Sequence, residues 1–364
     1  MNVPGQAQRE RMFANSPRAT VISPRMISRI LSIPLTALAF LAFLASAQAD
    51  PLAELAAFSS FKTVNLEKLA SGTVQATRGP AMSFPRGLAV ESCYVIRQPL
   101  PKAIALHLQW SPLKHPDLKV WLHGDLSAKS GPGDFQKLRS APSNGAVKAL
   151  VAATQKLAAG GADLQLSKAE AGAFAGTGGA EGGAMPEKVV NFWGSVLSQR
   201  LQAYASGGLG KLAPYENTSA AIRPADEVAR LLQDAGKVRG QFSALIDGSK
   251  GGLTPTLYWE LVNVEDSAAL NLGAASAKPG TNTWQGLDVQ YYATSGYCAL
   301  LTFVQMWPVN VGGEDVTLVW RGDLISSTTL ASLHGVERMG SSTAMMRETQ
   351  KFIERFLSDA AKAP

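Results

Sequence analysis

Residues 297–326 read YCALLTFVQMWPVNVGGEDVTLVWRGDLIS, and residues 343–361 read TAMMRETQKFIERFLSDAA. In the first stretch, two runs rich in Val, Leu and aromatic residues, 297–307 and 316–326, flank turn residues, which is typical of paired strands. In the second, apolar residues recur every three or four positions, which predicts an amphipathic helix with Ser341 or Ser342 as its cap. We expect one face of this helix to lie against the strands, namely the face with Met345, Met346, Phe352, Ile353, Phe356 and Leu357.

Further strand-like segments precede these two runs. Segments 257–264, 270–275 and 287–293 have the same composition, and Thr294-Ser295-Gly296 reads as a hairpin loop. The C-terminal half therefore predicts four or five antiparallel strands. Towards the N-terminus, helices are expected at 51–58 and 102–110, and strands at 72–78, 88–97 and 119–122.

Residues 129–252 are rich in Ala and Gly and have almost no β-branched alternation. Helices are expected at 146–159, from Pro186 to about Tyr204, and at 224–236, whereas the run 172–183 is typical of a flexible linker. The predicted fold class is α+β: an antiparallel sheet, a long C-terminal amphipathic helix, and a helical insertion at 129–252 within one domain, 50–364. Two separate subdomains are the alternative.

The N-terminal segment has the features of an export signal. Arg25 and Arg29 flank the start of an apolar run, and Ala47-Gln48-Ala49 offers small residues where a signal peptidase reads. We expect a signal peptide at 1–49, with Met26 as an alternative start, cleavage after Ala49, and export to a bacterial periplasm or the cell exterior. An uncleaved anchor is the alternative, but Pro34 interrupts a run already shorter than the roughly 20 apolar residues of a span. No stable membrane span is expected after cleavage.

The basic net charge of +6 belongs mostly to this segment. Residues 1–49 contain five Arg and one Glu, so residues 50–364 carry 29 basic and 27 acidic side chains. No Lys/Arg run with interleaved aromatic residues remains to follow a phosphate backbone. A nucleic-acid partner is therefore not expected.

The order of the predicted elements resembles the helix-grip plan of START-like lipid-binding domains. The resemblance covers residues 50–126 and 254–361 and is one of element order, so no residue role is carried over. It implies a cavity between the last helix and a curved sheet, and aromatic residues crowd the predicted strands. We therefore expect a site for an apolar small molecule or a lipid, with these candidate lining residues: Trp259, Tyr291, Phe303, Trp320, Met346, Phe352 and Phe356.

Familiar catalytic and cofactor motifs are missing from the sequence. The run Gly176–Glu181 has Glu where a dinucleotide fingerprint needs its third Gly, and Leu212 follows Gly210-Lys211 where a P-loop needs Ser or Thr. Ser111-Pro112-Leu113-Lys114 lacks the partner motifs of penicillin-interacting enzymes. We expect no cofactor and no metal site.

His123 and Asp125 are the weak catalytic candidates. The segment His123–Leu126 (HGDL) echoes Arg321–Leu324 (RGDL), and each follows a Trp-containing strand, which predicts a shared strand-to-turn device. A zinc site from His115, His123 and Asp125 matches no local ligand motif, so hydrogen-bonded surface histidines are the favoured interpretation.

The two cysteines, Cys93 and Cys298, each adjoin a Tyr in a predicted strand. In an oxidising compartment they could form one disulfide, closing a loop of about 200 residues worth roughly 4–5 kcal/mol in the chain-entropy model. Two separately buried thiols are the alternative.

Two functions follow from these observations. The preferred one is an exported, non-enzymatic binding or envelope-associated protein with a hydrophobic-ligand cavity, because no catalytic constellation is readable. The alternative is an exported hydrolase with a site near His123 and Asp125. The sequence does not identify the ligand or the oligomeric state.

Overall fold

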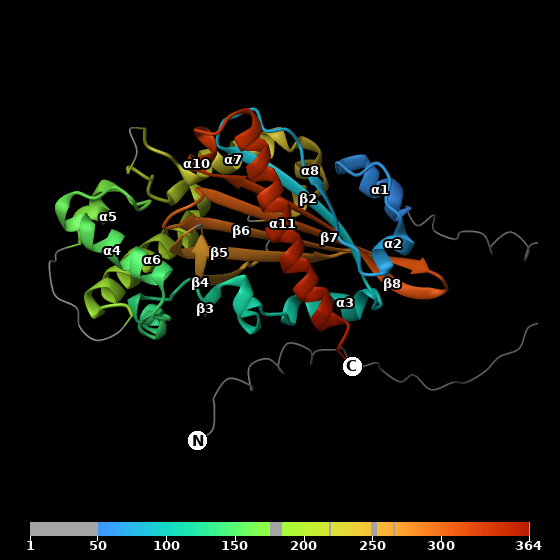
Figure 1. The fold of residues 1–364 in the computed structure, drawn as a ribbon, viewed down its shortest axis with the longest axis horizontal. Coiled ribbons are helices and arrows are strands. Elements are labelled where there is room, and N and C mark those ends of the chain that lie inside the picture. The colour runs from blue at the N-terminus through green and yellow to red at the C-terminus, as the bar shows by residue number, and fades with distance from the viewer. Residues whose placement is uncertain (1–49, 175–183, 218–219, 249–252, 265, 364) are drawn as a thin grey trace, which may run out of the picture. The chain divides into compact units, whose positions relative to one another are not determined.

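The computed structural model describes residues 50–174, 184–217, 220–248, 253–264 and 266–363 (Figure 1). The described residues from Asp50 onwards form one compact unit. The expected signal segment lies outside the described residues, as does most of the Gly-rich run 172–183. No helix in the described ranges is long and apolar enough to cross a membrane.

The observed elements agree closely with the expected ones. The helices are α1 (Pro51–Phe58), α2 (Leu66–Ala70), α3 (Leu100–Gln109), α4 (Gly145–Lys156), α5 (Lys168–Gly172), α6 (Glu187–Gly207), α7 (Pro224–Asp234), α8 (Gly236–Gln241), α9 (Ser243–Ile246), α10 (Thr328–Ala331) and α11 (Gly335–Ala360). Short 3-10 helices are η2 (Pro112–Lys114), η3 (Pro116–Leu118), η4 (Pro132–Ser140), η5 (Leu157–Ala159) and η6 (Gly208–Lys211). The strands are β1 (Gln75–Arg78), β2 (Gly87–Ile96), β3 (Val120–Leu126), β4 (Thr256–Val264), β5 (Ser267–Pro279), β6 (Trp284–Ala293), β7 (Ala299–Val311) and β8 (Glu314–Ser326).

The strands form one eight-stranded antiparallel sheet in the order β1-β2-β8-β7-β6-β5-β4-β3. An α+β fold with an antiparallel sheet is therefore confirmed, and the C-terminal half supplies five of its strands, β4 to β8, as expected. Strands β3 to β8 form a continuous meander, and β2 returns to pair with β8. Strand β2 is buried along nearly its whole length, which suits its position between β1 and β8.

Alternating side chains of β7 define the two faces of the sheet. Val304 and Met306 belong to a core cluster with Phe356 of α11, and we call this side face A. Leu301 and Phe303 point to the opposite side, face B, and belong to a different core cluster. Helices α3 and α11 therefore lie on face A (Figure 1).

Two groups of helices cover face B. Helices α1, α2, α7, α8 and α9 share a core with β2, β7 and β8, whereas α4 and α6 of the insertion share a core with β3 to β6. The strand register connects the two cores, because Leu257 of β4, Ala274 of β5, Val289 of β6 and Leu301 of β7 follow one another across the sheet on this face. The insertion, which includes α7 to α9, therefore supplies helices to both cores and packs on the same sheet as α1 and α2.

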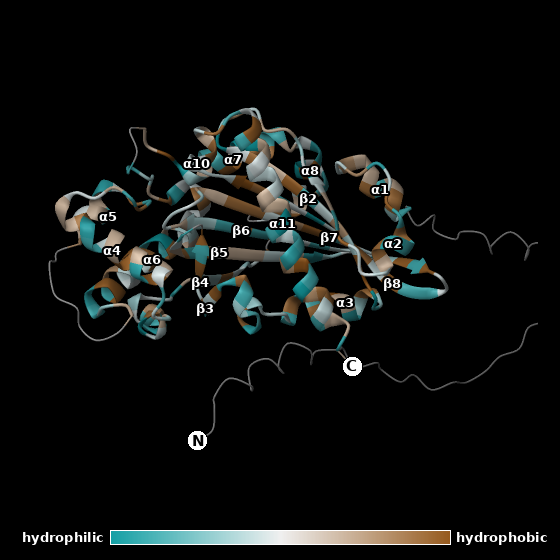
Figure 2. Ribbon diagram, viewed as in Figure 1, coloured by the Kyte–Doolittle hydropathy of each residue, from teal (hydrophilic) through white to brown (hydrophobic). Residues whose placement is uncertain are grey.

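Helix α11 begins eight residues before the expected start, at Gly335 rather than Thr343. The hydroxyls of Ser341, Ser342 and Thr343 donate to backbone carbonyls four residues earlier, so these residues lie inside the helix and the expectation that Ser341 or Ser342 caps it is wrong. Figure 2 shows hydrophilic residues along the outward side of α11.

The expected disulfide is wrong, because Cys93 and Cys298 are free and separately buried. Gly87 of β2 pairs with Ser326 of β8, and the backbone N–H of Cys298 donates to the carbonyl of that same Ser326. Cys93 lies six residues further along β2, roughly 20 Å away at about 3.3 Å per residue. A disulfide needs Cα atoms within about 7 Å of each other.

Candidate functional site

The seven residues expected to line one cavity lie on opposite faces of the sheet. Those from the strands are on face B and are almost wholly buried in core clusters, whereas those from α11 are on the face A side. The sheet itself separates the two sets, so they do not line a common cavity. The face B set is Trp259, Tyr291, Phe303 and Trp320; the α11 set is Met346, Phe352 and Phe356.

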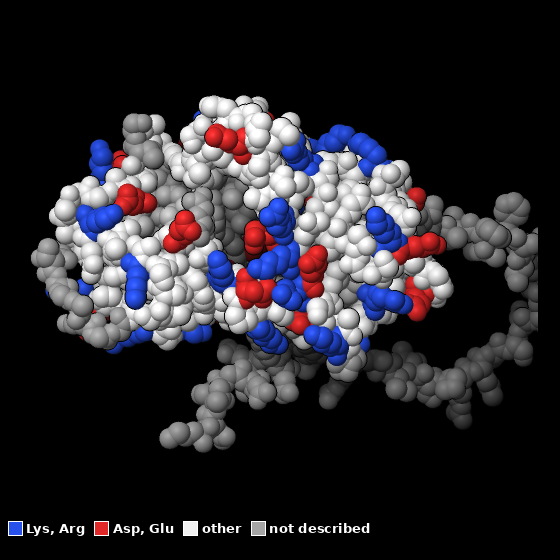
Figure 3. Space-filling model, viewed as in Figure 1, with Lys and Arg blue, Asp and Glu red and all other residues white. Residues whose placement is uncertain are grey.

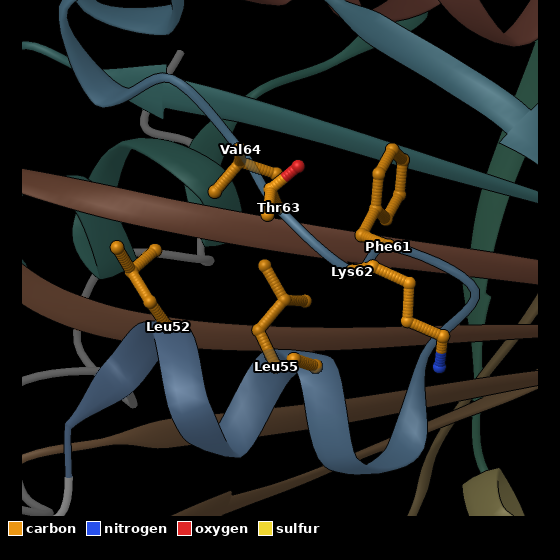
Figure 4. Close-up of a pocket in the computed structure, with 7 residues that line it drawn as sticks. Leu52, Leu55, Phe61, Lys62, Thr63 and Val64 are labelled. Carbon is orange, nitrogen blue, oxygen red and sulfur yellow. The ribbon is translucent and has the colours of Figure 1, made fainter.

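Two cavities occur elsewhere in the structure. One of about 140 Å³ lies between α1 and the following loop, where Leu55, Phe61 and Val64 line it (Figure 4). A larger one of about 560 Å³ lies on the insertion, between α5 and α6, where Phe174 and Phe192 line it. Neither contains a residue expected to line a cavity.

Face A is the more open side of the sheet, and its exposed part lies beside α11. Leu88 of β2, Ile325 of β8 and Leu300 of β7 are half-buried on face A. Their neighbours on face B, such as Leu324 and Leu301, are at most 2% exposed. Figure 3 shows the surface hollowed between α11 and the helices of the insertion, with charged side chains gathered along α11.

One row of side chains crosses face A from an apolar end to a polar end. Leu88, Ile325 and Leu300 pair in register on neighbouring strands β2, β8 and β7. The row continues through β6, β5, β4 and β3 with these residues: Gln290, Gly273, Tyr258 and Asp125. We call this the face A row. It changes from apolar to polar between β7 and β6.

At the polar end, Tyr258 reaches across β5 to Asp288 of β6. The Tyr258 hydroxyl donates to Asp288 Oδ2 at 2.7 Å. The ring lies directly over Gly273, because a Cβ atom there would come within 2.1 Å of Tyr258 Cζ. Burial raises the pKa of Asp288 to about 6, and the hydrogen bond from Tyr258 only partly offsets this. Glycine in the middle strand is therefore what allows the contact between β4 and β6.

Two neighbouring face A residues of β8, Arg321 and Asp323, form a charged pair that Thr302 of β7 completes. Arg321 Nε and Nη2 donate to the two carboxylate oxygens of Asp323, each at 2.8 Å, and the Thr302 hydroxyl donates to Asp323 Oδ1 at 2.7 Å. Phe352 of α11 lies over the Arg321 guanidinium, 5.1 Å from ring centre to Cζ. Arg321 therefore contacts both the polar side chains of face A and helix α11, and its positive charge is balanced by Asp323.

His123 of β3 lies between two carboxylates. Its Nδ1 is 3.2 Å from Glu260 Oε1, and its Nε2 is 3.3 Å from Asp125 Oδ1. The hydrogen bond to Glu260 is the largest influence on the histidine and raises its pKa. Its ring also stacks on Tyr258, with centroids 5.5 Å apart. The structure therefore joins the candidate pair His123 and Asp125 to the polar end of the face A row.

The predicted strand-to-turn role of the two X-Gly-Asp segments is wrong, because both lie inside strands, β3 and β8. In each, the residue before Gly pairs with the Asp after it, two positions along the same face. Each Gly lies against a Trp ring: a Cβ would come within 2.3 Å of Trp259 at Gly124 and within 2.5 Å of Trp320 at Gly322.

The residues of the imagined zinc site are not brought together. His115 Nε2 lies 2.7 Å from Asp359 Oδ2 of α11 and its ring stacks on Trp110, whereas His123 faces Glu260 and Asp125. Within the described ranges, no group of three or more His, Cys, Asp or Glu side chains is arranged to hold a metal ion.

Sequence reasoning missed most of the polar residues of this site. They are Tyr258, Glu260, Asn271, Asp288, Gln290, Tyr297, Thr302, Arg321 and Asp323. For six of them the signal was present as polar pairs two positions apart within a strand, which share one face: Tyr258 with Glu260, Asp288 with Gln290, and Arg321 with Asp323. No family model, curated protein or solved structure matches the chain, so the site is interpreted from its geometry.

Proposed function

We propose that this chain is an exported, non-enzymatic binding protein that holds a small amphipathic molecule on face A, beside α11. The observation that carries the proposal is the unequal cover of the two sheet faces. On face B, Leu301, Phe303 and Leu324 are at most 2% exposed, whereas Leu300, Ile325 and Gln290 on face A are only half-buried. Half-buried apolar residues beside ordered polar ones are typical of ligand sites.

The face A row fits an amphipathic ligand better than the wholly apolar one expected from the sequence. Leu88, Ile325 and Leu300 offer apolar contact over three neighbouring strands, about 10 Å at the usual strand spacing. The next strand along begins the polar end, where Tyr258 and Asp288 could fix the orientation of a polar group. An apolar tail along β2, β8 and β7 would therefore place a head group over β6.

The geometry does not favour the alternative hydrolase. Both ring nitrogens of His123 face carboxylate oxygens, of Glu260 and Asp125, so neither is free to take a proton from a nucleophile. A raised pKa also keeps more of this histidine protonated near neutral pH than an ordinary one. A screen of esterase, peptidase and glycosidase activities tests the alternative. The hydrolase alternative requires that the parent protein shows one of these activities and that His123→Ala abolishes it.

Binding can be tested at the apolar end of the row, with Leu300→Arg as the test variant. An arginine beside Leu88 and Ile325 should weaken binding of a fluorescent alkyl probe by at least about tenfold. An alkyl chain that covered the guanidinium would remove water from it, and this desolvation costs free energy. Leu113→Arg on η2 is the matched control, since Leu113 is 38% exposed and lies apart from the row. It should bind as the parent does.

The same experiment includes native mass spectrometry of the purified parent chain. A co-purifying small molecule that Leu300→Arg loses and Leu113→Arg keeps would support the proposal. A parent chain with no co-purifying molecule and no affinity for alkyl probes of any charge would overturn it.

A further inference from the structure

Two acceptor oxygens at the polar end of the face A row have no donor among the residues that the structure describes. One is Oδ1 of Asn271, whose side chain is on face A and only 1% exposed, and the other is Oδ1 of Asp288. Gly273 lies midway between Asn271 and Ala275 on β5, and Ala275 is the register partner of Asp288. The two oxygens therefore flank the place where the Tyr258 ring crosses β5.

The cations near this place already have partners of their own. Arg321 forms two hydrogen bonds with the Asp323 carboxylate, and His123 lies between Glu260 and Asp125. Asp288 receives one hydrogen bond, from the Tyr258 hydroxyl, and forms no ion pair within the described part of the chain. The polar end is thus short of both donors and positive charge, and the shortage is centred on Asp288.

We propose that the polar end of the face A row binds a protonated aliphatic amine, whose ammonium group donates to the Asp288 carboxylate. The inference rests on the proposed function, since it names the head group of the amphipathic ligand. An ammonium brings three donors and one positive charge, which are what this place lacks. The remaining carbon chain lies along Leu300 and Ile325.

A metal ion is a poorer match for the same place. It would need several carboxylate or imidazole ligands converging on one point, and no such group occurs in the described ranges. The Asp288 carboxylate and the Asn271 amide oxygen are separate acceptors, which suit a group that donates individual, directional hydrogen bonds.

The test compares three probes of equal chain length, octylamine, octanol and octanoate, by isothermal titration at pH 7.5 on the purified chain. We expect octylamine to bind at least about tenfold more tightly than octanol, because a charge-assisted hydrogen bond exceeds a neutral one by about that factor. Asp288→Asn should remove this preference. Leu300→Arg should weaken all three probes.

Equal binding of the three probes, or tightest binding of octanoate, would overturn the amine inference and leave the proposed function standing. Octylamine binding that survives both Asp288→Asn and Leu300→Arg would place the amine elsewhere and overturn the inference. Binding of none of the probes would remove the proposed function as well. If circular dichroism shows that Asp288→Asn does not fold, Asn271→Leu takes its place, with a reduced preference for octylamine expected.

Discussion

Replacing Asp288 by Asn should make the protein more stable at pH 8 while it weakens amine binding. The carboxyl group is held on face A next to Tyr258, and burial raises its pKa from 3.8 to about 6. Ionisation is therefore harder in the folded chain than in the unfolded one. A difference of about two pKa units corresponds to at most about 3 kcal/mol of unfolding free energy that the ionised carboxylate costs the fold.

The sign of the pH dependence follows from the direction of this shift. A group whose pKa is raised by folding contributes its full stability below the unfolded value, near pH 4, and loses it as the pH rises to about 6. Asn imitates the neutral carboxyl group, and its amide oxygen can still accept from Tyr258. Glu260, Arg321 and Asp323 also face this carboxyl and are unchanged in the variant. The stability difference should therefore be near zero at pH 4 and reach its maximum above pH 6.

Urea unfolding followed by tryptophan fluorescence at pH 4 and pH 8 measures this difference. Asp163→Asn is the control, because Asp163 is 63% exposed in a surface ion pair with Lys156. Its effect should stay within about 0.5 kcal/mol at both pH values. An Asp288→Asn variant less stable than the parent at pH 8, or a stability difference that does not change with pH, would show that folding does not raise the pKa of this carboxyl group.

Three further predictions concern the framework around the site. Iodoacetamide should leave Cys93 and Cys298 unmodified in the native protein, because burial raises the pKa of both thiols to about 12, and should modify both in urea without reductant. A protein mass two hydrogens lower than that of the dithiol would show a disulfide and contradict this. Gly273→Ala should lower the free energy of unfolding in urea by about 1–3 kcal/mol, since the new Cβ would lie 2.1 Å from the Tyr258 ring. Gly133→Ala is the control, because nothing lies within 4 Å of its Cβ, and an equal loss in the two variants would refute the close approach of Tyr258. Arg200→Met should cost about 3–5 kcal/mol by the same assay, because it leaves a buried carboxylate unpaired, and a loss under 1 kcal/mol would contradict this.

Most of the fold could be predicted from the sequence because its signals are local. The run 51–58 became α1 with the expected bounds, and Pro at the start of α7 and before α6 marked both helices. The expected loop at 294–296 lies between β6 and β7, with Gly296 at a φ of +84°, although β7 begins two residues later than expected, at Ala299. The start of α11 was misplaced because hydroxyl groups can bond within a helix as well as cap it.

The site could not be predicted in the same way, because it depends on which face each strand turns towards α11. Aromatic residues such as Trp259 and Trp320 suggested a cavity by their number alone, yet both are buried on face B. The charged pair of Arg321 and Asp323 resembled a turn in the sequence but lies inside β8. Composition indicates which residues form strands, whereas the face on which each side chain lies depends on the register of the strands.

A single irregularity in β6 decides the composition of both faces. Leu272 of β5 pairs with Tyr292, but the next residue, Gly273, pairs with Gln290, so Tyr291 is an extra residue in β6. Tyr291 and Tyr292 consequently both contact the insertion on face B: one stacks on Tyr204 at 3.9 Å, and the other lies 4.2 Å from the Arg200 guanidinium.

The residues before the bulge are shifted by the same irregularity. With strict alternation, Asp288 and Gln290 would share the face of Tyr292 and be buried under the insertion. Because of the extra residue, they lie on face A, where Asp288 meets Tyr258. Bulges commonly re-aim side chains beside functional sites, and this one both anchors the insertion on face B and supplies the carboxylate on face A.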